Sequence, residues 1–529
     1  MPTLKSRFHV KAEYNVPPHV LEVVTTLQKA GFEAYLVGGC VRDLIMGKVP
    51  KDWDVTTNAR PEQIQALFTE TFYENEYGTV GVITTPDGSR ESSDNVSQET
   101  LSDGSREIAA FAEATEEPKK EVIEVTPYRL ETKYSNFRHP DAVTFTSNLE
   151  EDLKRRDFTM NAIALDPNTD KGHFIDPFNG LKDIKDTLIR AVGEASDRFT
   201  EDALRMMRGV RLAAQLGFMI DSETEAAIIK NKELIRKIAA ERIHDELMKL
   251  LNTDYAVDGI RYLRVTGLLD LIIPELLEGI GIEQRGEHIY DVWEHNLKSL
   301  EHAVKNRWSF HVRLAALLHD VGKPRTRVRD EARQIWTFHG HDVVGGKMTK
   351  KILERLKFSR EIIDDVSKLV RYHLFFSDTD KITLSAVRRM VRNVGSGLIW
   401  DLMKVRYADR IGTGRPKEAP YRLRKYEAMI EEAMRDPISV AMLKIDGARI
   451  MEIGEIQPGP KIGWVLHALL EEVLDEPKKN STEYLDQRAK ELFALPEAEL
   501  KRLGEEGKEK KSDLEDAAVQ EINKRHYVK

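Results

Sequence analysis

Cysteine is almost absent from this sequence, since Cys40 is the single thiol among 529 residues. One cysteine excludes an internal disulfide framework and suits a reducing compartment. No apolar run approaches the roughly 18–20 residues that cross a bilayer, and residues 1–20 lack the apolar core of a signal peptide. We therefore expect a soluble, cytoplasmic protein that has no membrane partner.

Net positive charge, which many nucleic-acid-binding proteins carry, is also lacking, because the formal net charge is −9. Residues 87–121 supply most of this deficit, with ten acidic and four basic residues, or −6. Residues 404–425 show the opposite balance, with eight Lys or Arg against two acids. Local patches rather than totals set phosphate affinity, so a nucleic-acid partner is not excluded. The basic run fits either a phosphate-binding surface or an ordinary solvated helix face.

Hydrophobic periodicity predicts a mixed α/β region followed by an almost wholly helical one. Helical patterns occupy 18–30 and resume after Pro61, and from about residue 196 they dominate, beginning with 200–216. Strand patterns occur at 33–38, 52–57, 79–85 and 121–129. The Ser/Asp/Glu-rich segment 87–121 is predicted to be a mobile insertion. The fold class is therefore expected to be α+β, with its sheet in the N-terminal part.

Residues 35–57 carry the first chemical motif, YLVGGCVRDLIMGKVPKDWDVTT. A glycine pair without Cβ atoms lets backbone N–H groups approach phosphates closely. Asp52 and Asp54 stand at i and i+2 on a predicted strand, so their carboxylates would share one face. Mg²⁺ is usually held by one or two carboxylates together with substrate phosphates. The segment therefore predicts a nucleotidyl-transfer site, although a lone Gly-Gly or Asp-x-Asp is usually only a turn.

The second motif is EEDLKRRDFTMNAIAL, at residues 150–165. Arg155 and Arg156 supply positive charge for a triphosphate, while Asp157 and Asn161 can bind ribose hydroxyls. A carboxylate that faces a 2′-hydroxyl gains a hydrogen bond that a deoxyribonucleotide cannot offer, which would select ribonucleotides.

The third motif is TEDALRMMRGVRLAAQLGF, at residues 200–218. On a helix, Asp202 and Arg205 would project side by side. Asp202 could then accept from the amino group of cytosine or adenine while Arg205 donates to the ring nitrogen, and guanine and uracil would mismatch. Arg208 and Arg211 continue this face toward the phosphates. The alternative is a plain i,i+3 salt bridge on an exposed helix.

In this order the three motifs resemble the polymerase-β-like nucleotidyltransferases, specifically class II tRNA nucleotidyltransferases (CCA-adding enzymes) and bacterial poly(A) polymerases. The glycine turn with its Asp-x-Asp pair, RRDFTMNA and EDALRMMR match the family's motifs. Residues 133–145 resemble its flexible loop, 176–180 its hinge, 241–247 a neck motif and 442–475 its tRNA-contacting region. The resemblance covers most of 30–480 and implies that tRNA, ATP and CTP are the partners.

The resemblance also implies roles for individual residues. Asp52 and Asp54 would bind Mg²⁺, and Glu124 would be a third catalytic carboxylate, although a half-exposed strand glutamate is the alternative. The nucleotide would contact Gly38, Gly39, Arg42, Arg155, Arg156, Asp157, Asn161, Asp202, Arg205, Arg208 and Arg211.

A second constellation lies in the helical region, where imidazoles and carboxylates recur at separated positions. An adjacent His-Asp pair on an apolar helix, with further His and a distal Asp, is a divalent-metal pattern. It resembles the HD phosphohydrolase superfamily, which implies a site for a divalent transition metal. A core histidine or a retained tRNA-binding scaffold is the alternative. The primary metal set would be His295, His319, Asp320 and Asp409, with His341 and His373 for a second metal.

The resulting prediction is an enzyme that adds CCA to tRNA 3′ ends from CTP and ATP without a nucleic-acid template. The alternatives are a poly(A) polymerase, a partial CC- or A-adding enzyme, or an HD metal phosphohydrolase with a nucleotide-sensing head. The expected domains are the head at 18–180, the helical neck with the nucleotide template at 181–284, the HD domain at 285–412, a helical tRNA-binding region at 413–495 and a charged tail at 496–529.

Overall fold

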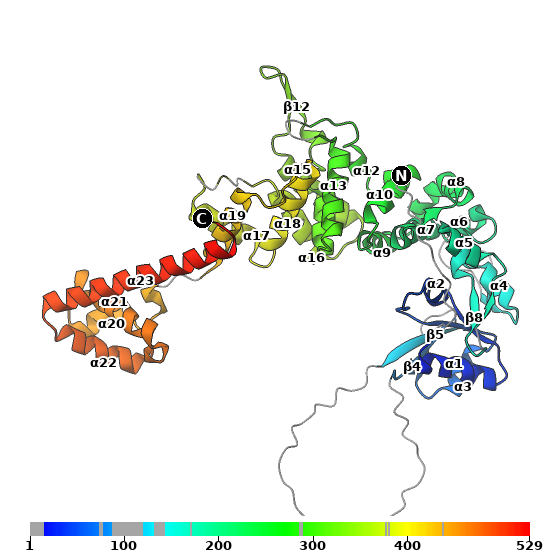
Figure 1. Ribbon diagram of the computed structural model, residues 1–529, viewed down its shortest axis with the longest axis horizontal. Coiled ribbons are helices and arrows are strands. Elements are labelled where there is room, and N and C mark those ends of the chain that lie inside the picture. The colour runs from blue at the N-terminus through cyan, green and yellow to red at the C-terminus, as the bar shows by residue number, and fades with distance from the viewer. Residues whose placement is uncertain are drawn as a thin grey trace, which may run out of the picture. The chain divides into compact units, whose positions relative to one another are not determined.

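The computed structural model describes residues 15–73, 78–86, 120–131, 143–169, 172–284, 289–375, 378, 381–435 and 439–528. The chain forms two compact units (Figure 1). The first runs to Glu278 and adds Val304–Phe310 and Lys351–Ser359, and the second takes the remaining segments from Gly279 onward. Within the described residues, no helix combines the length and the apolar character needed to span a bilayer.

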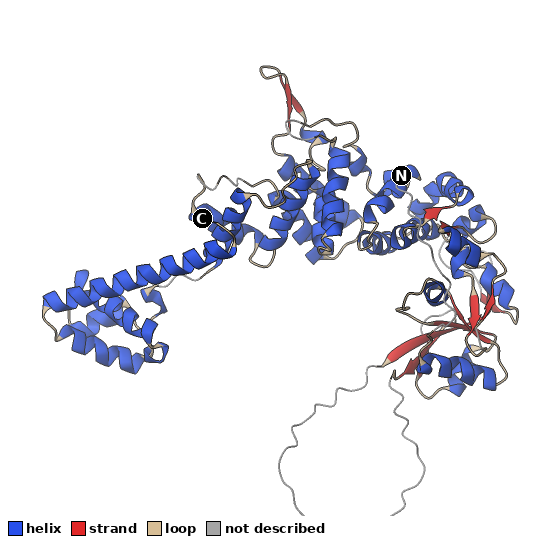
Figure 2. Cartoon of the chain, in the orientation of Figure 1, coloured by secondary structure: helices blue, strands red, loops and turns tan. Residues whose placement is uncertain are grey.

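The first unit contains a seven-stranded mixed sheet with the strand order β3-β4-β5-β2-β1-β8-β9 (Figure 2). Only β2 and β5 pair in parallel, and the other neighbours are antiparallel. This confirms the α+β fold class. The strands are β1 (Ala34–Val37), β2 (Asp54–Thr57), β3 (Thr71–Tyr73), β4 (Val80–Thr84), β5 (Glu121–Pro127), β8 (Ala164–Asp166) and β9 (His173–Ile175).

Helices and short strands complete the sheet region. Helix α1 buries Val20, Val23, Val24 and Leu27, which is the i, i+3, i+4, i+7 spacing of an amphipathic helix. A separate hairpin pairs β6 (Arg129–Glu131) with β7 (Val143–Phe145). The helices are α1 (Pro18–Lys29), α2 (Gly39–Ile45), α3 (Pro61–Leu67), α4 (Leu149–Lys154) and α5 (Gly180–Asp186).

Two predicted segments fall largely outside the described residues. The predicted insertion 87–121 is described only at Lys120 and Glu121, where β5 begins. The loop 133–145 is described only from residue 143.

Helices continue the first unit after the sheet, with one difference from the expected pattern. The predicted helix 200–216 is two helices, because Asp202 has an extended backbone (φ −137°, ψ 104°) between them. Asp202 Oδ1 accepts from the backbone N–H of Leu204, which satisfies a donor at the start of the second helix. The helices are α6 (Ala195–Glu201), α7 (Leu204–Leu216), α8 (Ser222–Asn231), α9 (Ala240–Leu251), α10 (Ala256–Val265), α11 (Leu269–Ile272) and α12 (Pro274–Leu277), and β10 (Leu188–Ile189) pairs with β11 (Met219–Ile220).

The late segment Lys351–Ser359 completes the packing of the first unit. Arg355 donates to both carboxylate oxygens of Glu275, at 2.7 and 2.8 Å. The ring of Phe358 lies 4.3 Å, centroid to centroid, from that of His244. Residues more than 75 positions apart in sequence therefore share one core.

In its described residues the second unit is helical apart from one hairpin, which the expected, almost wholly helical pattern did not include. Strands β12 (Val328–Asp330) and β13 (Ile335–Thr337) pair in antiparallel register and project from the helices (Figure 1). Ile335 and Trp336 are residues that favour strands. The helices around it are α13 (Val292–Lys305), α14 (Phe310–Leu318), α15 (His341–Arg355), α16 (Arg360–Tyr372), α17 (Leu384–Val394) and α18 (Ile399–Gly412).

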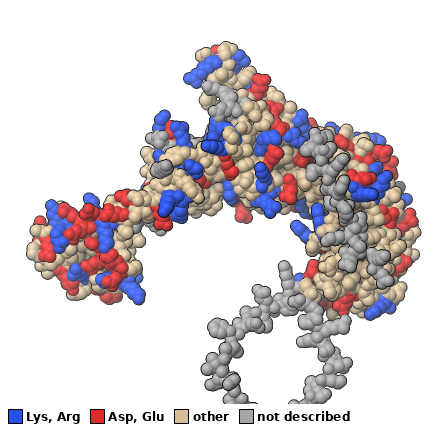
Figure 3. Space-filling model, in the orientation of Figure 1, with Lys and Arg blue, Asp and Glu red and all other residues tan. Residues whose placement is uncertain are grey.

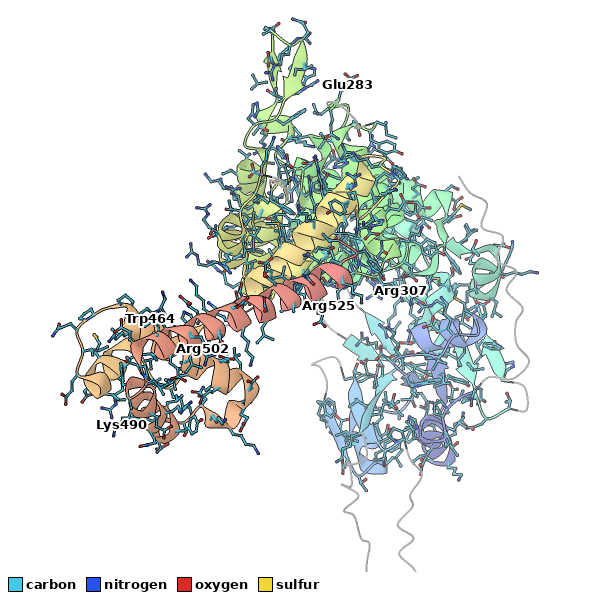
Figure 4. The ribbon with its side chains drawn as sticks, turned by 60° about the vertical axis from the view of Figure 1, so that its left-hand side comes forward. Glu283, Arg307, Trp464, Lys490, Arg502 and Arg525 are labelled. Carbon is cyan, nitrogen blue, oxygen red and sulfur yellow. The ribbon has the colours of Figure 1, made fainter. Side chains whose placement is uncertain are left out.

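The last part of the chain ends in a 29-residue helix, α23 (Glu497–Arg525), within the segment that the sequence predicted only as a charged tail. Its glycines allow close packing on α21, since a Cβ on Gly504 would lie 2.5 Å from Cα of Trp464. Figure 4 shows Arg502 and Arg525 near opposite ends of α23 and Trp464 beside it. The other helices here are α19 (Tyr421–Met434), α20 (Gly447–Gly454), α21 (Pro460–Asp475) and α22 (Thr482–Phe493).

Candidate functional site

The glycine turn between β1 and α2 is in direct contact with two other predicted site residues. Gly38 has φ +84°, a conformation that L side chains rarely adopt. A Cβ at this position would lie 3.1 Å from Asp54 Oδ2 and 3.4 Å from Arg156 Nη1. The structure thus brings the first and second motifs together around a backbone that has no room for a side chain.

The carboxylates of the first motif are arranged differently from the strand pair that was predicted. Asp54 opens β2 and stands opposite Glu124 of β5 in the parallel register, so the two lie on neighbouring strands. Asp52 precedes β2 and is exposed, so strand alternation does not govern its direction. All three offer the oxygen ligands that Mg²⁺ prefers. In the described part of the first unit, no three of the candidate ligand atoms lie within 4.8 Å of one another.

The arginine pair of the second motif is held by Asp152, which sequence analysis did not single out. Arg155 donates to Asp152 Oδ1 from Nε and Nη2, at 2.9 and 2.8 Å. Arg156 Nη2 lies 3.5 Å from Asp152 Oδ2. Asp152 is fully buried and also accepts from Thr56 on β2. Its spacing of i+3 and i+4 to the two arginines was the available sequence signal.

Asp157 is buried, and both oxygens of its carboxylate accept hydrogen bonds. Oδ2 accepts from Arg208 Nε and pairs with Nη2, at 2.8 and 2.7 Å, and Oδ1 accepts from the backbone N–H of Phe158. Burial raises the pKa of Asp157, but Arg208 and Arg205 outweigh it and hold that pKa at about 2. The group is therefore a carboxylate at any pH near neutrality.

Arg42 and Asn161 form a second buried link between the first two motifs. Arg42 Nη1 donates to Asn161 Oδ1 at 3.0 Å, and Arg42 Nε donates to Asp43 at 2.8 Å. Asn161 Nδ2 lies 3.4 Å from Asp157 Oδ1. These contacts join the glycine-turn helix to the residue predicted to face the ribose.

The predicted template residues are near each other in sequence, but each is bonded to a different partner. Asp202 accepts from Arg242 of α9, with Nη2–Oδ2 at 2.7 Å and Nη1–Oδ1 at 3.3 Å. Arg205 donates to Glu201 at 2.7 Å and to the backbone carbonyl of Arg155 at 3.0 Å. The prediction that Asp202 and Arg205 share one helix is wrong, because the chain is extended at Asp202. The bond to Arg155 connects the template to the arginine pair.

The ion pairs around the template include residues that sequence reasoning missed. Arg211 pairs with buried Glu246 of α9 at 2.6 Å. Glu246 and Arg242 both lie within ERIHDEL, the segment that resembles a neck motif of the family. That resemblance marked the segment in the sequence but did not indicate the ion-pair partner of either residue.

In the second unit the structure brings together all six residues of the predicted metal set. Nε2 atoms of His295 and His319 converge to 2.9 Å, and Asp409 Oδ1 lies 3.3 Å from His295 Nε2. These three form one group of close ligand atoms. The second group is Asp320, His341 and His373.

Asp320 joins the two groups. Its Oδ2 lies 3.1 Å from His295 Nε2, whereas its Oδ1 lies 3.4 Å from His341 Nε2 and 3.6 Å from His373 Nε2. Asp320 is 1% exposed, so its charge needs a close partner. The geometry places it between both groups, whereas sequence analysis assigned it to the first alone.

Backbone carbonyls orient three of these imidazoles. Nδ1 of each lies 2.7–2.8 Å from the carbonyl three residues earlier, at Ala316, Phe338 and Val370 respectively for His319, His341 and His373. A carbonyl can only accept, so Nδ1 carries the proton and Nε2 is left to bind a metal.

Protons on the histidine side balance the negative charge of the carboxylates within the cluster. Burial lowers the pKa of His319, but Asp320 and Asp409 raise it to about 10. Burial raises the pKa of Asp320, yet Lys323 and His319 hold it well below its ordinary value. A divalent cation can take over this balancing role, because its binding releases such protons.

A cavity of about 960 Å³ opens onto this cluster. Its lining includes Asp320, His341, His373 and Asp409, together with the side chains of the β12–β13 hairpin and of α19.

Three family models match the chain. The poly(A) polymerase head domain matches residues 34–92 and 82–190, the probable RNA- and SrmB-binding site of polymerase A matches 217–279, and the HD domain matches 287–414. The matched segments contain the glycine turn, the arginine pair and the histidine cluster.

Characterised relatives share this organisation. The CCA-adding enzyme of Leuconostoc mesenteroides is 31% identical over 89% of this chain and 95% of its own length. An A-adding tRNA nucleotidyltransferase of Deinococcus radiodurans is 36% identical over 63% of this chain and 76% of its own. Two lactobacillus CCA-adding enzymes match at 42–43% identity, where this chain spans only about half their length.

A solved structure has the same fold. The Bacillus stearothermophilus CCA-adding enzyme in complex with CTP is 27% identical, with a TM-score of 0.55, and the match covers 90% of this chain and 98% of that one. The chain therefore belongs to the CCA-adding enzyme family of tRNA nucleotidyltransferases.

Proposed function

We propose that this chain adds C, C and A to the 3′ ends of tRNA, using CTP and ATP and no nucleic-acid template. The observation that carries the proposal is the contact of Gly38 with Asp54 and Arg156, and the bond from Arg205 to the Arg155 carbonyl. These contacts support a single continuous site in which the turn would bind phosphate, Asp54 would bind metal and Arg205 would select the base.

The residues divide the work of nucleotide binding. Asp52, Asp54 and Glu124 would hold Mg²⁺, which when bound activates the primer 3′-hydroxyl and neutralises the departing pyrophosphate. Within the described residues, Arg156 Nε is buried with no hydrogen-bond partner, as expected of a donor that awaits a phosphate. Further contacts to the triphosphate would come from Gly38, Gly39, Arg42, Arg155, Arg208 and Arg211.

Base and sugar selection would fall to four polar side chains. Asp202 accepts from the exocyclic amino group and Arg205 donates to the ring nitrogen, a polarity that fits cytosine and adenine. Uracil and guanine present a ring N–H beside a carbonyl and would leave buried groups unpaired. Asp157, with Asn161, recognises the ribose hydroxyls.

An incorporation assay tests the proposal and its alternatives. Three RNA primers are offered with each nucleoside triphosphate separately: a tRNA ending before the first C, a tRNA ending in CC, and an unrelated RNA. With CTP alone we expect two C on the first primer, with ATP alone we expect one A on the second, and with both nucleotides together we expect two C followed by one A on the first. Extension of the unrelated RNA with ATP would favour a poly(A) polymerase, and A without C would favour the activity named for the Deinococcus relative.

A second activity is favoured by the six-residue cluster at the cavity. We propose that the HD region binds a divalent transition metal and hydrolyses a phosphate ester. Screening the purified protein against phosphomonoesters with a panel of divalent metals tests this. Phosphatase activity without any nucleotide addition would instead support an HD phosphohydrolase with a nucleotide-sensing head.

A further inference from the structure

The wall of the HD cavity away from the histidine cluster is strongly cationic. Among the described residues that line it, the only two carboxylates, Asp320 and Asp409, both belong to the cluster. Lys323 pairs with Asp320 and Arg406 pairs with Asp409, and the cations on the rest of the wall are Arg410, Arg415 and Arg422. Metal binding by the histidines does not require these additional cations. Their positive charge instead favours an anionic ligand that extends beyond a single phosphate.

Aromatic rings alternate with these cations. Trp336, Phe338 and Tyr421 line the same cavity, and the first comes from the projecting hairpin β12–β13. The guanidinium carbon of Arg327 lies 3.9 Å from the centre of the Trp336 ring, and that of Arg329 lies 5.4 Å from it. Within the described residues, Arg327 Nε is buried with no hydrogen-bond partner.

The hairpin carries further arginines beyond the cavity, together with acidic residues. Arg329 Nε lies 3.9 Å from Glu331 Oε1 and Arg333 Nε lies 3.9 Å from Asp330 Oδ2, and basic side chains are visible at the projecting end of the hairpin (Figure 3). Val328 on β12 is 62% exposed, so the hairpin contributes little to the core. Proteins that bind single-stranded nucleic acid combine aromatic rings, on which bases stack, with nearby arginines that contact the phosphates. Trp336 and the arginines around it have this composition.

We propose that this surface, formed by Arg327 and Trp336 of the hairpin with Arg422 of α19, binds a single nucleic-acid strand at the mouth of the HD cavity. Unpaired bases can stack on Trp336, whereas paired bases in a duplex cannot. A cavity of about 960 Å³ is at the upper end for a small molecule, and the cations continue past it. The choice of RNA rather than DNA rests on the proposed function, whereas the argument that the surface binds a single strand does not depend on it.

Crosslinking and affinity measurements on the full chain test the inference. A 12-nucleotide single-stranded RNA containing 4-thiouridine should crosslink to residues 327–338 and 421–423. Arg327→Gln and Arg422→Gln should each weaken binding several-fold and reduce the salt slope by about 0.7, the value of one phosphate contact on a single strand. Trp336→Ala should weaken binding on the order of 10-fold, the low end for one stacked base, and Trp336→Phe should restore most of it.

Matched controls make the result decisive. Arg502→Gln makes the same charge change on α23, where Arg502 pairs with Glu506, and should leave affinity unchanged. Equal weakening by Arg502→Gln, equal binding of a blunt RNA duplex, or equal competition by AMP alone would overturn the proposal. Nucleotide addition should be normal in all of these variants. If the wild-type chain adds no nucleotide, the proposed function fails while the strand-binding result stands.

Discussion

Gly38 is the residue at which the backbone and the chemistry of the site are most tightly coupled. Both its positive φ and the 3.1 Å separation between a would-be Cβ and Asp54 Oδ2 disfavour a side chain at this position. Nearby Gly47 has φ +69° but has nothing within 4 Å of a would-be Cβ. Substitutions at the two glycines therefore distinguish the effect of backbone strain alone from the effect of strain combined with a steric clash.

We expect Gly38→Ala to lower kcat/KM for CTP at least 100-fold, because the new methyl displaces Asp54 or Arg156. Gly47→Ala should lose about 1 kcal/mol of stability through strain and keep its activity within a few-fold. Steady-state incorporation and thermal melting of both variants check this. Similar activities for the two variants would show that the turn does not need close approach.

Asp157 is a residue whose ionisation state the structure fixes. Its pKa in the fold, about 2, is below the ordinary 3.8, so the ion pair with Arg208 stabilises the fold above that ordinary value. This contribution is lost only as the pH falls from about 3.8 through about 2. The group cannot titrate between pH 5.5 and 9.

The preference for CTP over dCTP should accordingly stay constant between pH 5.5 and 9 in the wild-type enzyme. Asp157→Asn should reduce that preference about 10-fold, since it removes a charged hydrogen-bond acceptor. The kcat/KM ratio for the two nucleotides across this pH range is the measurement. A ratio that rises through a pKa near 6 would assign sugar selection to another group.

At the scale of elements, the break between α6 and α7 positions the template through α9. Arg242 holds both oxygens of Asp202, and Glu246 holds Arg211, so α9 fixes two residues of the template segment. If Asp202 selects the base as we propose, Arg242 acts through it and is a positioning residue.

Arg242→Gln should lower kcat/KM for CTP and ATP by about 10- to 100-fold and narrow the preference for CTP over UTP, because Asp202 is no longer aimed. Arg236→Gln is the matched control, since Arg236 is exposed and pairs only with Glu233 among the described residues. Incorporation of each nucleotide separately gives the preference. A uniform loss for all four nucleotides would mean that Arg242 supports the fold alone.

The packing of α23 on α21 is the second case in which an element depends on single residues. A Cβ on Gly507 would lie 2.2 Å from the carbonyl oxygen of His467, so any side chain forces the helices apart. Gly463 lies in α21 with nothing within 4 Å of a would-be Cβ.

Gly507→Ala should make residues 497–528 sensitive to limited proteolysis and lower the melting temperature of the second unit by several degrees. Gly463→Ala should raise stability by up to about 1 kcal/mol, because alanine is the better helix former. Peptide mapping after brief digestion distinguishes the two. Equal protection in Gly507→Ala would show that α23 does not depend on this contact.

The family could be recognised from the sequence because the order of the motifs is specific, whereas the roles of the motif residues stay predictions. Long-range partners could not be recognised, since nothing local to Asp202 indicates Arg242, forty positions away. The break at Asp202 was hidden because EDALRM has good helix propensity and the capping bond overrides it. The α23 helix was not predicted, because dense charge dominates residues 496–529 and the close packing of Gly504 and Gly507 on α21 is a long-range contact.

At the scale of the whole molecule, the two units hold separate chemistry. All six residues of the histidine cluster lie in the second unit, and the glycine turn, arginine pair and template lie in the first. Our proposed domain boundaries assign the same residues to the HD domain and to the head and neck.

Asp320→Asn should therefore abolish metal retention in the second unit without changing nucleotide addition. The substitution removes the negative charge that the two groups share, and single-ligand losses at such sites strongly weaken metal affinity. Metal content after dialysis and incorporation on tRNA are the two readouts. Loss of nucleotide addition in a folded Asp320→Asn protein would contradict the separation.

The late segment Lys351–Ser359 has a consequence for how the chain is made. Arg355 and Phe358 belong to the packing of the first unit, yet they leave the ribosome about 80 residues after Glu275. At a synthesis rate of roughly 5–20 residues per second, residues 351–359 are made several seconds after Glu275, and only then can the packing of the first unit be completed. Much of the HD region is synthesised during that interval. A nascent chain stalled at residue 300 should therefore hold the nucleotide site in an unfinished core.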